Sequence, residues 1–145
     1  MAAGLLFTGC PQKVKEETKP VYYTVSLVHE GGSLTANPVL QGGKALKDSE
    51  ITFTAIPANS VSHEVDTWEV TGGQILEGGG EGSASVKVKI TANTTVKVSF
   101  KKMYSVTFNV EGGNGTLKAT PEGGAETAAS PISVEHEKTV TFTAT

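Results

Sequence analysis

Two stretches of this sequence occur twice. Residues 23–32 (YTVSLVHEGG) return as residues 104–113 (YSVTFNVEGG), and residues 51–55 (ITFTA) return as residues 140–144 (VTFTA). The offset between the copies grows from 81 to 83 and then to 89 positions, which indicates small insertions in loops. An internal repeat of this kind predicts a tandem array of one structural unit. Shorter matches lie between the anchors, at Leu34, Ala36 and Pro38 in the first copy and at Leu117, Ala119 and Pro121 in the second.

The repeated segments alternate apolar and polar residues, which is the period of a β-strand with one buried face. No stretch keeps apolar residues at the spacing of an amphipathic helix for more than one turn. The 17 glycines and 6 prolines interrupt the chain every few residues, and the glycine pairs predict tight turns. We therefore expect a fold that is all-β or nearly so. The side chains expected on the buried faces are Tyr23, Val25, Leu27, Ile51, Phe53, Ala55, Val86, Val88, Ile90, Val96, Val98 and Phe100 in the first copy, and Tyr104, Val106 and Phe108 in the second.

The two copies differ in completeness. Residues 21–102 contain every signal of the repeat and predict a complete β module, large enough for its own core. Residues 103–145 contain about half of these signals and predict a partial second module, because the second copy ends just before the position that matches Pro57. We therefore expect the sequence to be a fragment or a truncated reading frame, with sheet edges left unpaired in the second copy.

The first residues resemble the end of a bacterial lipoprotein signal. A short apolar run at residues 5–7 (LLF) leads into Thr8-Gly9-Cys10, and a lipobox of this form is cleaved before the cysteine, which is then lipidated. Only nine residues precede Cys10 and none is basic, so we expect the true start of the signal upstream of Met1. The alternative is an ordinary cysteine at a ragged chain end.

Residues 1–10 are therefore interpreted as a partial lipoprotein signal with its lipobox, and residues 11–20 as a tether. The tether is rich in Lys, Glu, Thr, Gln and Pro and has a single valine, a composition that cannot build a core. Fully extended, it would reach ~33 Å. Several acyl chains on one cysteine anchor a protein stably, so we expect an exported protein held at the bacterial cell envelope or cell surface through lipidated Cys10.

The remaining chemistry of the sequence is sparse. The net charge is -3, and twelve lysines without any arginine are spread among 15 acids, so nucleic acid is not an expected partner. One cysteine and no histidine pair at ligand spacing predict no metal site, and we expect no cofactor. No serine stands in a nucleophile motif, so no catalytic residue is predicted. The dipeptides His63-Glu64 and His136-Glu137 are expected to point to opposite faces of strands.

Three pieces of the first copy are the most distinctive: residues 52–57 (TFTAIP), Trp68 and residues 91–100 (TANTTVKVSF). In this order they resemble the divergent internalin B-repeat family, whose modules are strung in tandem in bacterial surface proteins and lipoproteins. The resemblance covers residues 22–101 fully and residues 104–145 in part. It implies tandem small β-grasp-like or β-sandwich modules, the second one truncated, which act as spacers or adhesive units and have no catalytic site.

Trp68 has two interpretations. A single large aromatic at a fixed position of a repeat fills the centre of a small β core, and this interpretation is favoured. An exposed Trp68 beside Asp66 and Glu69 would instead indicate a ligand-binding site that extends into the Gly72–Gly82 loop, because tryptophan is a common anchor in binding sites.

The observations together favour a non-enzymatic, lipid-anchored bacterial cell-surface repeat protein that acts as a spacer or adhesive module. One alternative is a module that binds an extracellular glycan or a host protein near Trp68. Another is a non-catalytic repeat region of a larger exported enzyme. The expected partners are the membrane, through Cys10, and in the first alternative the glycan or host protein; ligand identity, repeat number and oligomeric state are left open.

Overall fold

The computed structural model describes residue 9 and residues 17–145. These residues form strands and no helix, so the predicted all-β fold is confirmed and no described segment is a helix that could cross a membrane. Cys10 and Thr8 of the predicted lipobox lie outside the described residues. The strands are β1 (Tyr22–His29), β2 (Gly32–Asn37), β3 (Lys44–Leu46), β4 (Glu50–Pro57), β5 (His63–Gly78), β6 (Ser85–Val106), β7 (Leu117–Pro121), β8 (Ile132–Glu135) and β9 (Val140–Ala144).

Of the strands that the structure describes, seven form one curled mixed sheet, and β7 and β9 form a separate two-stranded sheet. The central strand is β6, which is 22 residues long and pairs with β1, β4, β5 and β8 along its length. The β1–β6 pair is parallel, and the other three pairs are antiparallel. No helix covers the sheet in the described part of the chain, and the sheet closes over its own core, which is closer to a sandwich than to a β-grasp arrangement.

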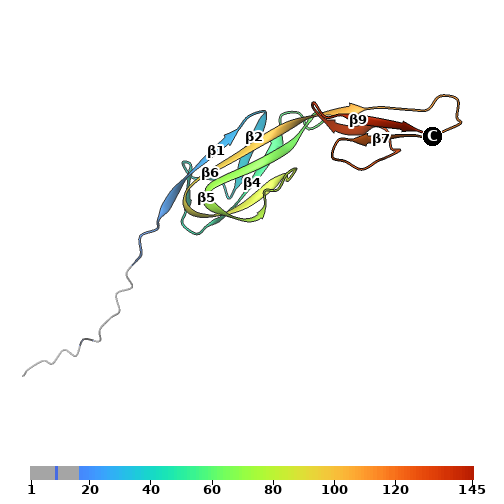
Figure 1. The fold of residues 1–145 in the computed structure, drawn as a ribbon. Helices are drawn as coiled ribbons and strands as arrows, with labels where there is room; N and C mark the ends of the chain where they lie inside the picture. The colour runs from blue at the N-terminus through green and yellow to red at the C-terminus, as the bar shows by residue number, and fades with distance from the viewer. Residues whose placement is uncertain (1–8, 10–16) are drawn as a thin grey trace, which may run out of the picture.

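The long β5–β6 hairpin is bent at Gly72. The pairing register shifts between Thr71 and Gly73, opposite residues 91–94 of β6. Gly72 has a φ of +78°, and a Cβ at this position would lie 2.0 Å from the carbonyl oxygen of Asn93, so a larger residue does not fit. Because of the bend, the first half of β6 runs along β4 and the second half along β1 (Figure 1).

The core lies inside the curled sheet and follows the predicted alternation. All the side chains expected on buried faces of the first copy are either buried or partly buried against this core, so the prediction is confirmed. Apolar burial of this kind contributes about 1.5–3 kcal/mol for each large side chain and is the main force that holds the sheet closed. The buried cluster consists of Val25, Leu34, Ala45, Ile51, Phe53, Ala55, Val65, Val86, Val88, Ile90, Val96 and Val98.

The second copy repeats the strand pairs of the first copy in the same register. In the first copy β2 pairs with β4, and Ala36 lies opposite Phe53. In the second copy β7 pairs with β9, and Ala119 lies opposite Phe142. These four residues occupy matching repeat positions, so the repeat found in the sequence is also a repeat of backbone pairing.

A second strand pair is repeated in the same way. In the first copy β1 pairs with β3, and Tyr23 lies opposite Ala45. In the second copy the end of β6 pairs with β8, and Tyr104 lies opposite Val134. The end of β6 is therefore both the last strand of the first copy and the first strand of the second.

The second copy departs from the sequence prediction after Val106. The alternation from Tyr104 to Phe108 predicts a continuous strand, but β6 ends at Val106 and residues 107–116 belong to no strand. In the first copy the matching residues of β1, from Val25 onward, pair with β6. No described strand takes that place in the second copy, so the backbone has no neighbour with which to form a ladder, and the prediction of a strand at Phe108 was wrong.

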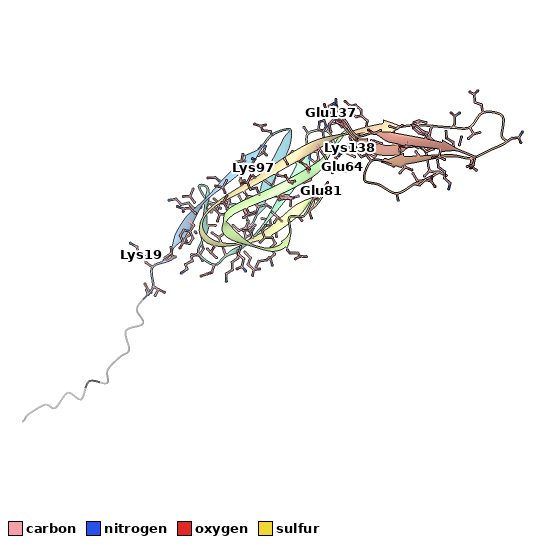
Figure 2. All side chains as sticks on the ribbon, in the orientation of Figure 1. Lys19, Glu64, Glu81, Lys97, Glu137 and Lys138 are labelled. Carbon is pink, nitrogen blue, oxygen red and sulfur yellow. The ribbon has the colours of Figure 1, made fainter. Side chains whose placement is uncertain are left out.

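The two copies follow one another along a single direction. The first copy begins near Lys19, and the second copy lies beyond the opposite end of the first copy (Figures 1 and 2). Glu137 and Lys138 lie near the boundary between the two copies (Figure 2). The boundary between the two copies, between Lys102 and Met103, is crossed by an unbroken strand, β6, and residues 107–116 then lead to the two-stranded sheet.

Candidate functional site

Trp68 lies on the core side of β5. It pairs with Val98, whose side chain is buried, and residues paired across antiparallel strands point to the same face of a sheet. The indole ring is partly buried against the core, and its Nε1–H donates a hydrogen bond to the carbonyl oxygen of Ser83 at 2.7 Å. The ring therefore packs against the core and holds the loop between β5 and β6.

Asp66 and Glu69 lie on the outer side of β5. A bulge precedes Trp68, and the hydroxyl of Ser99 donates a hydrogen bond to Oδ2 of Asp66 at 3.1 Å. Oε2 of Glu69 lies 3.6 Å from Nζ of Lys97, its cross-strand neighbour on β6. The structure thus brings the two carboxylates to one face and places Trp68 on the other, so the three residues predicted as one ligand site do not converge.

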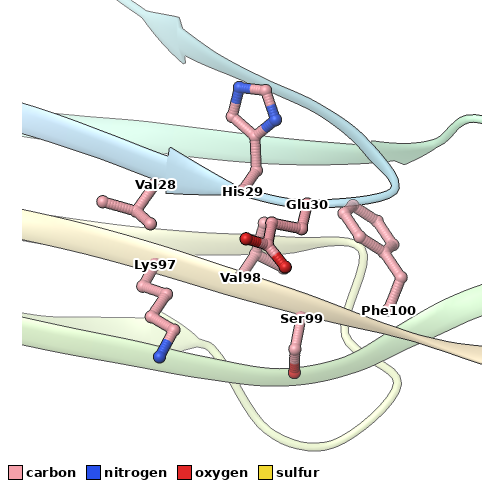
Figure 3. A pocket seen from close by; sticks show the side chains of 7 residues that line it. All are labelled: Val28, His29, Glu30, Lys97, Val98, Ser99 and Phe100. Atoms are coloured by element: carbon pink, nitrogen blue, oxygen red, sulfur yellow. The ribbon is translucent and has the colours of Figure 1, made fainter.

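A shallow hollow of about 280 Å³ lies beside the end of the parallel β1–β6 pair (Figure 3). Sequence reasoning missed this hollow because residues 28–30 and residues 97–100 are far apart in the chain. Only the parallel pairing of β1 with β6 brings them together, and an alternating pattern does not reveal which strands are neighbours. The hollow is lined by Val28, His29, Glu30, Lys97, Val98, Ser99 and Phe100.

The polar groups of this hollow do not form a catalytic arrangement. Figure 3 shows the His29 ring pointing away from Lys97 and Ser99. The Ser99 hydroxyl is bonded instead to Asp66 and Thr67, and the hydrogen bonds among the described residues include none between Ser99 and His29. An activated serine needs its base within hydrogen-bond reach, so the hollow offers surface contacts and no nucleophile–base pair.

Lys101 connects the two copies by ion pairs. Its Nζ lies 2.7 Å from Oε1 of Glu81 in the first copy and 3.7 Å from Oε2 of Glu135 in the second. The Lys101 side chain is only 16% exposed, so these charges are screened less than those of an open surface pair. The hydrogen bond to Glu81 raises the pKa of Lys101, and the same hydrogen bond lowers the pKa of Glu81 below its usual 4.5.

Backbone and aromatic contacts reinforce the same junction. The Met103 N–H donates to the carbonyl oxygen of Ser62, and the His136 N–H donates to the carbonyl oxygen of Lys102, both at 2.8 Å. Nζ of Lys102 lies 4.8 Å from the ring centroid of Tyr104, which is the geometry of a cation–π contact. Residues of both copies therefore hold the junction at several points.

The histidines take no part in a common centre. Nδ1 of His63 lies 3.0 Å from the hydroxyl oxygen of Ser62. His136-Glu137 lies in the turn after β8, where Glu137 has a φ of +66°, and Nδ1 of His136 is 3.9 Å from Oε1 of Glu137. The expectation that this dipeptide splits across a strand was wrong, because a turn residue with positive φ does not alternate faces. Within the described residues, no group of three or more His, Cys, Asp or Glu side chains could hold a metal ion.

The sequence model of the divergent InlB B-repeat domain matches residues 23–104, which extend from β1 to Tyr104 near the end of β6. This chain belongs to the divergent InlB B-repeat family. The resemblance found from the sequence is confirmed, and with it the assignment to a repeat domain of bacterial surface proteins. Searches of curated proteins and of solved structures found no match. The matched B-repeat residues contain Trp68 and the whole buried cluster of the first copy.

Proposed function

We propose that these B-repeats act as a non-enzymatic spacer that holds other surfaces away from the bacterial envelope. The observation that carries the proposal is the junction, where β6 ends one repeat and begins the next without an intervening loop. The second copy lies beyond the end of the first copy at which β6 leaves it, so a further copy joined in this way lengthens the array (Figure 1).

The contacts at the junction support a stiff connection. A flexible loop between modules would let them move independently. Here the backbone continues as a strand, and Lys101 bridges Glu81 and Glu135 across the boundary. We expect the first copy and the β8 segment of the second copy to tumble as one body in NMR relaxation measurements on the full chain. Insertion of Gly-Gly-Ser between Lys102 and Met103 should separate their correlation times, and two independent correlation times in the unmodified chain would contradict the spacer.

The anchor of this spacer is proposed to be lipidated Cys10. Support comes from the lipobox-like sequence Thr8-Gly9-Cys10 and from the polar tether that follows it. When the chain is exported behind a functional signal peptide in a bacterium with a lipoprotein pathway, it should enter the detergent phase. Cys10→Ala should move the protein to the aqueous phase, while Pro11→Ala, the matched control beside it, should not. Detergent partitioning that survives Cys10→Ala would refute the anchor.

Binding of a glycan or host protein near Trp68 stays a prediction. The indole face is partly buried and its N–H is occupied by Ser83, so a ligand at this position would have to use the outer face of β5, with Asp66 and Glu69. A ligand panel tested against a double substitution of Asp66 and Glu69 to alanine would separate this function from the spacer, which does not need these carboxylates.

A further inference from the structure

The end of the first copy nearest Lys19 carries an exposed apolar cluster (Figure 2). Val21, Tyr22 and Leu46 are 49%, 58% and 45% exposed. Tyr22 lies opposite Leu46 in the antiparallel β1–β3 pair, so the two side chains share the outer face of this pair. The carbonyl oxygen of Val21 accepts a hydrogen bond from the Lys47 N–H at 2.8 Å, which holds Val21 beside the end of β3. Three large apolar side chains are therefore exposed together.

Lysines that make no ion pair gather at the same end. Lys44 is two residues from Leu46 in β3, so both side chains point to the same face. Lys47 follows Leu46 directly, and Lys19 lies just before β1. Among the described residues, Lys19, Lys44 and Lys47 form no ion pair with a carboxylate. The described lysines that do form such pairs are Lys87, Lys89, Lys97, Lys101, Lys118 and Lys138.

The acids close to this end in the sequence leave it with a net positive charge. Oδ1 of Asp48 lies 3.5 Å from Nζ of Lys89, and Glu50 is paired with Lys87. Glu17 is then the acid set against the three lysines. The whole chain carries a charge of -3, so this end has the opposite sign to the rest of the molecule. The apolar cluster and the three lysines together form a basal patch, which consists of Val21, Tyr22, Leu46, Lys19, Lys44 and Lys47.

A bilayer with anionic headgroups fits both features of the basal patch. Tyrosine is enriched where hydrocarbon meets water, because its ring is apolar and its hydroxyl is polar. Lysine ammonium groups are attracted to anionic headgroups, while their methylene stems lie along apolar surface. The strength of binding at such an interface depends on the apolar area that is buried and on the charge attraction.

The position of the basal patch in the chain favours the same partner. Only residues 11–20 separate it from Cys10, and this segment reaches at most ~33 Å when fully extended. With Cys10 lipidated as proposed above, the patch stays within that distance of the bilayer. A second contact on an already tethered chain is effectively intramolecular, so even weak docking is strongly populated.

We propose that the basal patch docks on a bilayer surface rich in anionic phospholipids, with Val21, Tyr22 and Leu46 at the level of the headgroups and the three lysines beside the phosphates. The docking rests on the proposed anchor and adds the contact that the anchored module itself makes. It gives the array a fixed direction away from the membrane, which a tether alone does not.

The test uses the full chain with Cys10→Ala, which cannot be lipidated, so its result is independent of the anchor. Vesicles of phosphatidylglycerol and phosphatidylcholine are compared by co-sedimentation with vesicles of phosphatidylcholine alone, at low and at raised salt. We expect binding to the anionic vesicles that weakens at raised salt, and at least about tenfold weaker binding to the neutral vesicles.

Substitutions of the lysines locate the charge attraction. Replacement of Lys19, Lys44 and Lys47 by glutamine should weaken binding by at least about tenfold, since each lysine near an anionic surface contributes about fivefold. The matched control replaces three ion-paired lysines elsewhere and changes the net charge equally. It should alter binding by no more than about twofold, because those lysines lie away from the bilayer. The control positions are Lys97, Lys118 and Lys138.

Substitutions of the apolar cluster test insertion at the headgroup level. Tyr22→Ser combined with Leu46→Ser should weaken vesicle binding by at least about fivefold, because less apolar area is buried. Val61→Ser is the control, because Val61 is 92% exposed and its neighbour Ser62 bonds to Met103 at the opposite end of the first copy. Trp68 fluorescence checks that the first copy stays folded in each variant.

Three outcomes would overturn the docking. Absence of binding to anionic vesicles would refute it, whatever the result of the detergent partitioning of Cys10→Ala. Equal losses in the two lysine triples would show that net charge alone drives the binding. Equal binding to a soluble polymer of glycerol phosphate, unaffected by the Tyr22 and Leu46 substitutions, would show that the partner is an anionic polymer and not a bilayer.

Discussion

Phe53 and Phe142 allow the contribution of the β5–β6 hairpin to be measured within one molecule. Both occupy the same repeat position, and both lie opposite an alanine on the neighbouring strand, Ala36 or Ala119. Phe53 is 0% exposed and Phe142 is 45% exposed. Phe53→Ala should therefore destabilise the first copy by ~3–5 kcal/mol, the range for removal of a buried aromatic side chain. Phe142→Ala should cost only about 1–2 kcal/mol, because roughly half of the ring is already in water.

The assay uses the position of the single tryptophan. Trp68 lies in the first copy, so its fluorescence during urea unfolding reports the stability of that copy. The fluorescence midpoint should fall in Phe53→Ala and hardly change in Phe142→Ala. Far-UV circular dichroism reports the strands of both copies. If Phe53→Ala does not fold, the milder Phe53→Leu can replace it. With a free energy of unfolding that falls by about 1 kcal/mol per molar urea, Phe53→Leu should lower the fluorescence midpoint by about 1–2 M. Equal losses of stability from Phe53→Ala and Phe142→Ala would show that both faces are equally buried in solution, and would refute the argument.

Three further predictions concern the bend, the indole and the junction. Gly72→Ala should destabilise the first copy by at least about 2 kcal/mol, because an alanine there has an unfavourable positive φ and its Cβ clashes with the backbone of Asn93. Gly42 also has a positive φ, +59°, but open space around it, so Gly42→Ala should cost only about 1 kcal/mol. Equal melting temperatures of the two variants would contradict the role of the bend. Trp68→Phe should lower stability by about 1 kcal/mol through loss of the indole hydrogen bond, and an unchanged unfolding midpoint would show that this bond is not made. The hydrogen bond between Glu81 and Lys101 lowers the pKa of Glu81 and raises the pKa of Lys101, so Glu81→Gln should lower the free energy of unfolding only while both groups are charged. This difference between the wild type and the variant should be full from pH 4.5 to about pH 10.5, and it should disappear as the pH falls through the lowered pKa of Glu81 or rises through the raised pKa of Lys101. A difference that does not change with pH in acid titrations would exclude the ion pair as its cause.

The alternation of side chains predicted most of the first copy and much of the second. Residues such as Val86 and Val88 could be assigned to a buried face because the period of two is a local property of a strand. The repeat itself predicted that Leu34 and Ala36 would lie in a strand equivalent to that of Leu117 and Ala119, and they do, although β2 ends one residue before Pro38. These inferences needed no knowledge of which strands are neighbours.

The residues that meet at the candidate sites could not be predicted in the same way, because they depend on which strands pair with one another. The hollow beside His29 exists because β1 pairs in parallel with β6, and parallel pairing requires a distant crossover that leaves no local mark in the sequence. The bulge before Trp68 shifts the strand register, so the faces of Asp66 and Trp68 could not be read from a strict alternation. The bend at Gly72 was visible only as one glycine among many.

The contrast between the copies indicates which contacts set the strand register and which contacts bury the core. The β2–β4 and β7–β9 pairs join residues 15 to 27 positions apart and have the same register, although among the described strands β6 pairs with β4 and not with β9. Their register must therefore come from turns and alternation near each strand, as expected for short-range pairs. Burial has a different source: it depends on β6, whose pairing with β1 joins residues 69 positions apart, from Val25 to Thr94. A contact this distant in sequence carries a loop-closure cost that the short-range pairs do not. The register of the β2–β4 pair is thus set locally, whereas the core of the first copy is completed by the distant pairing of β6 with β1.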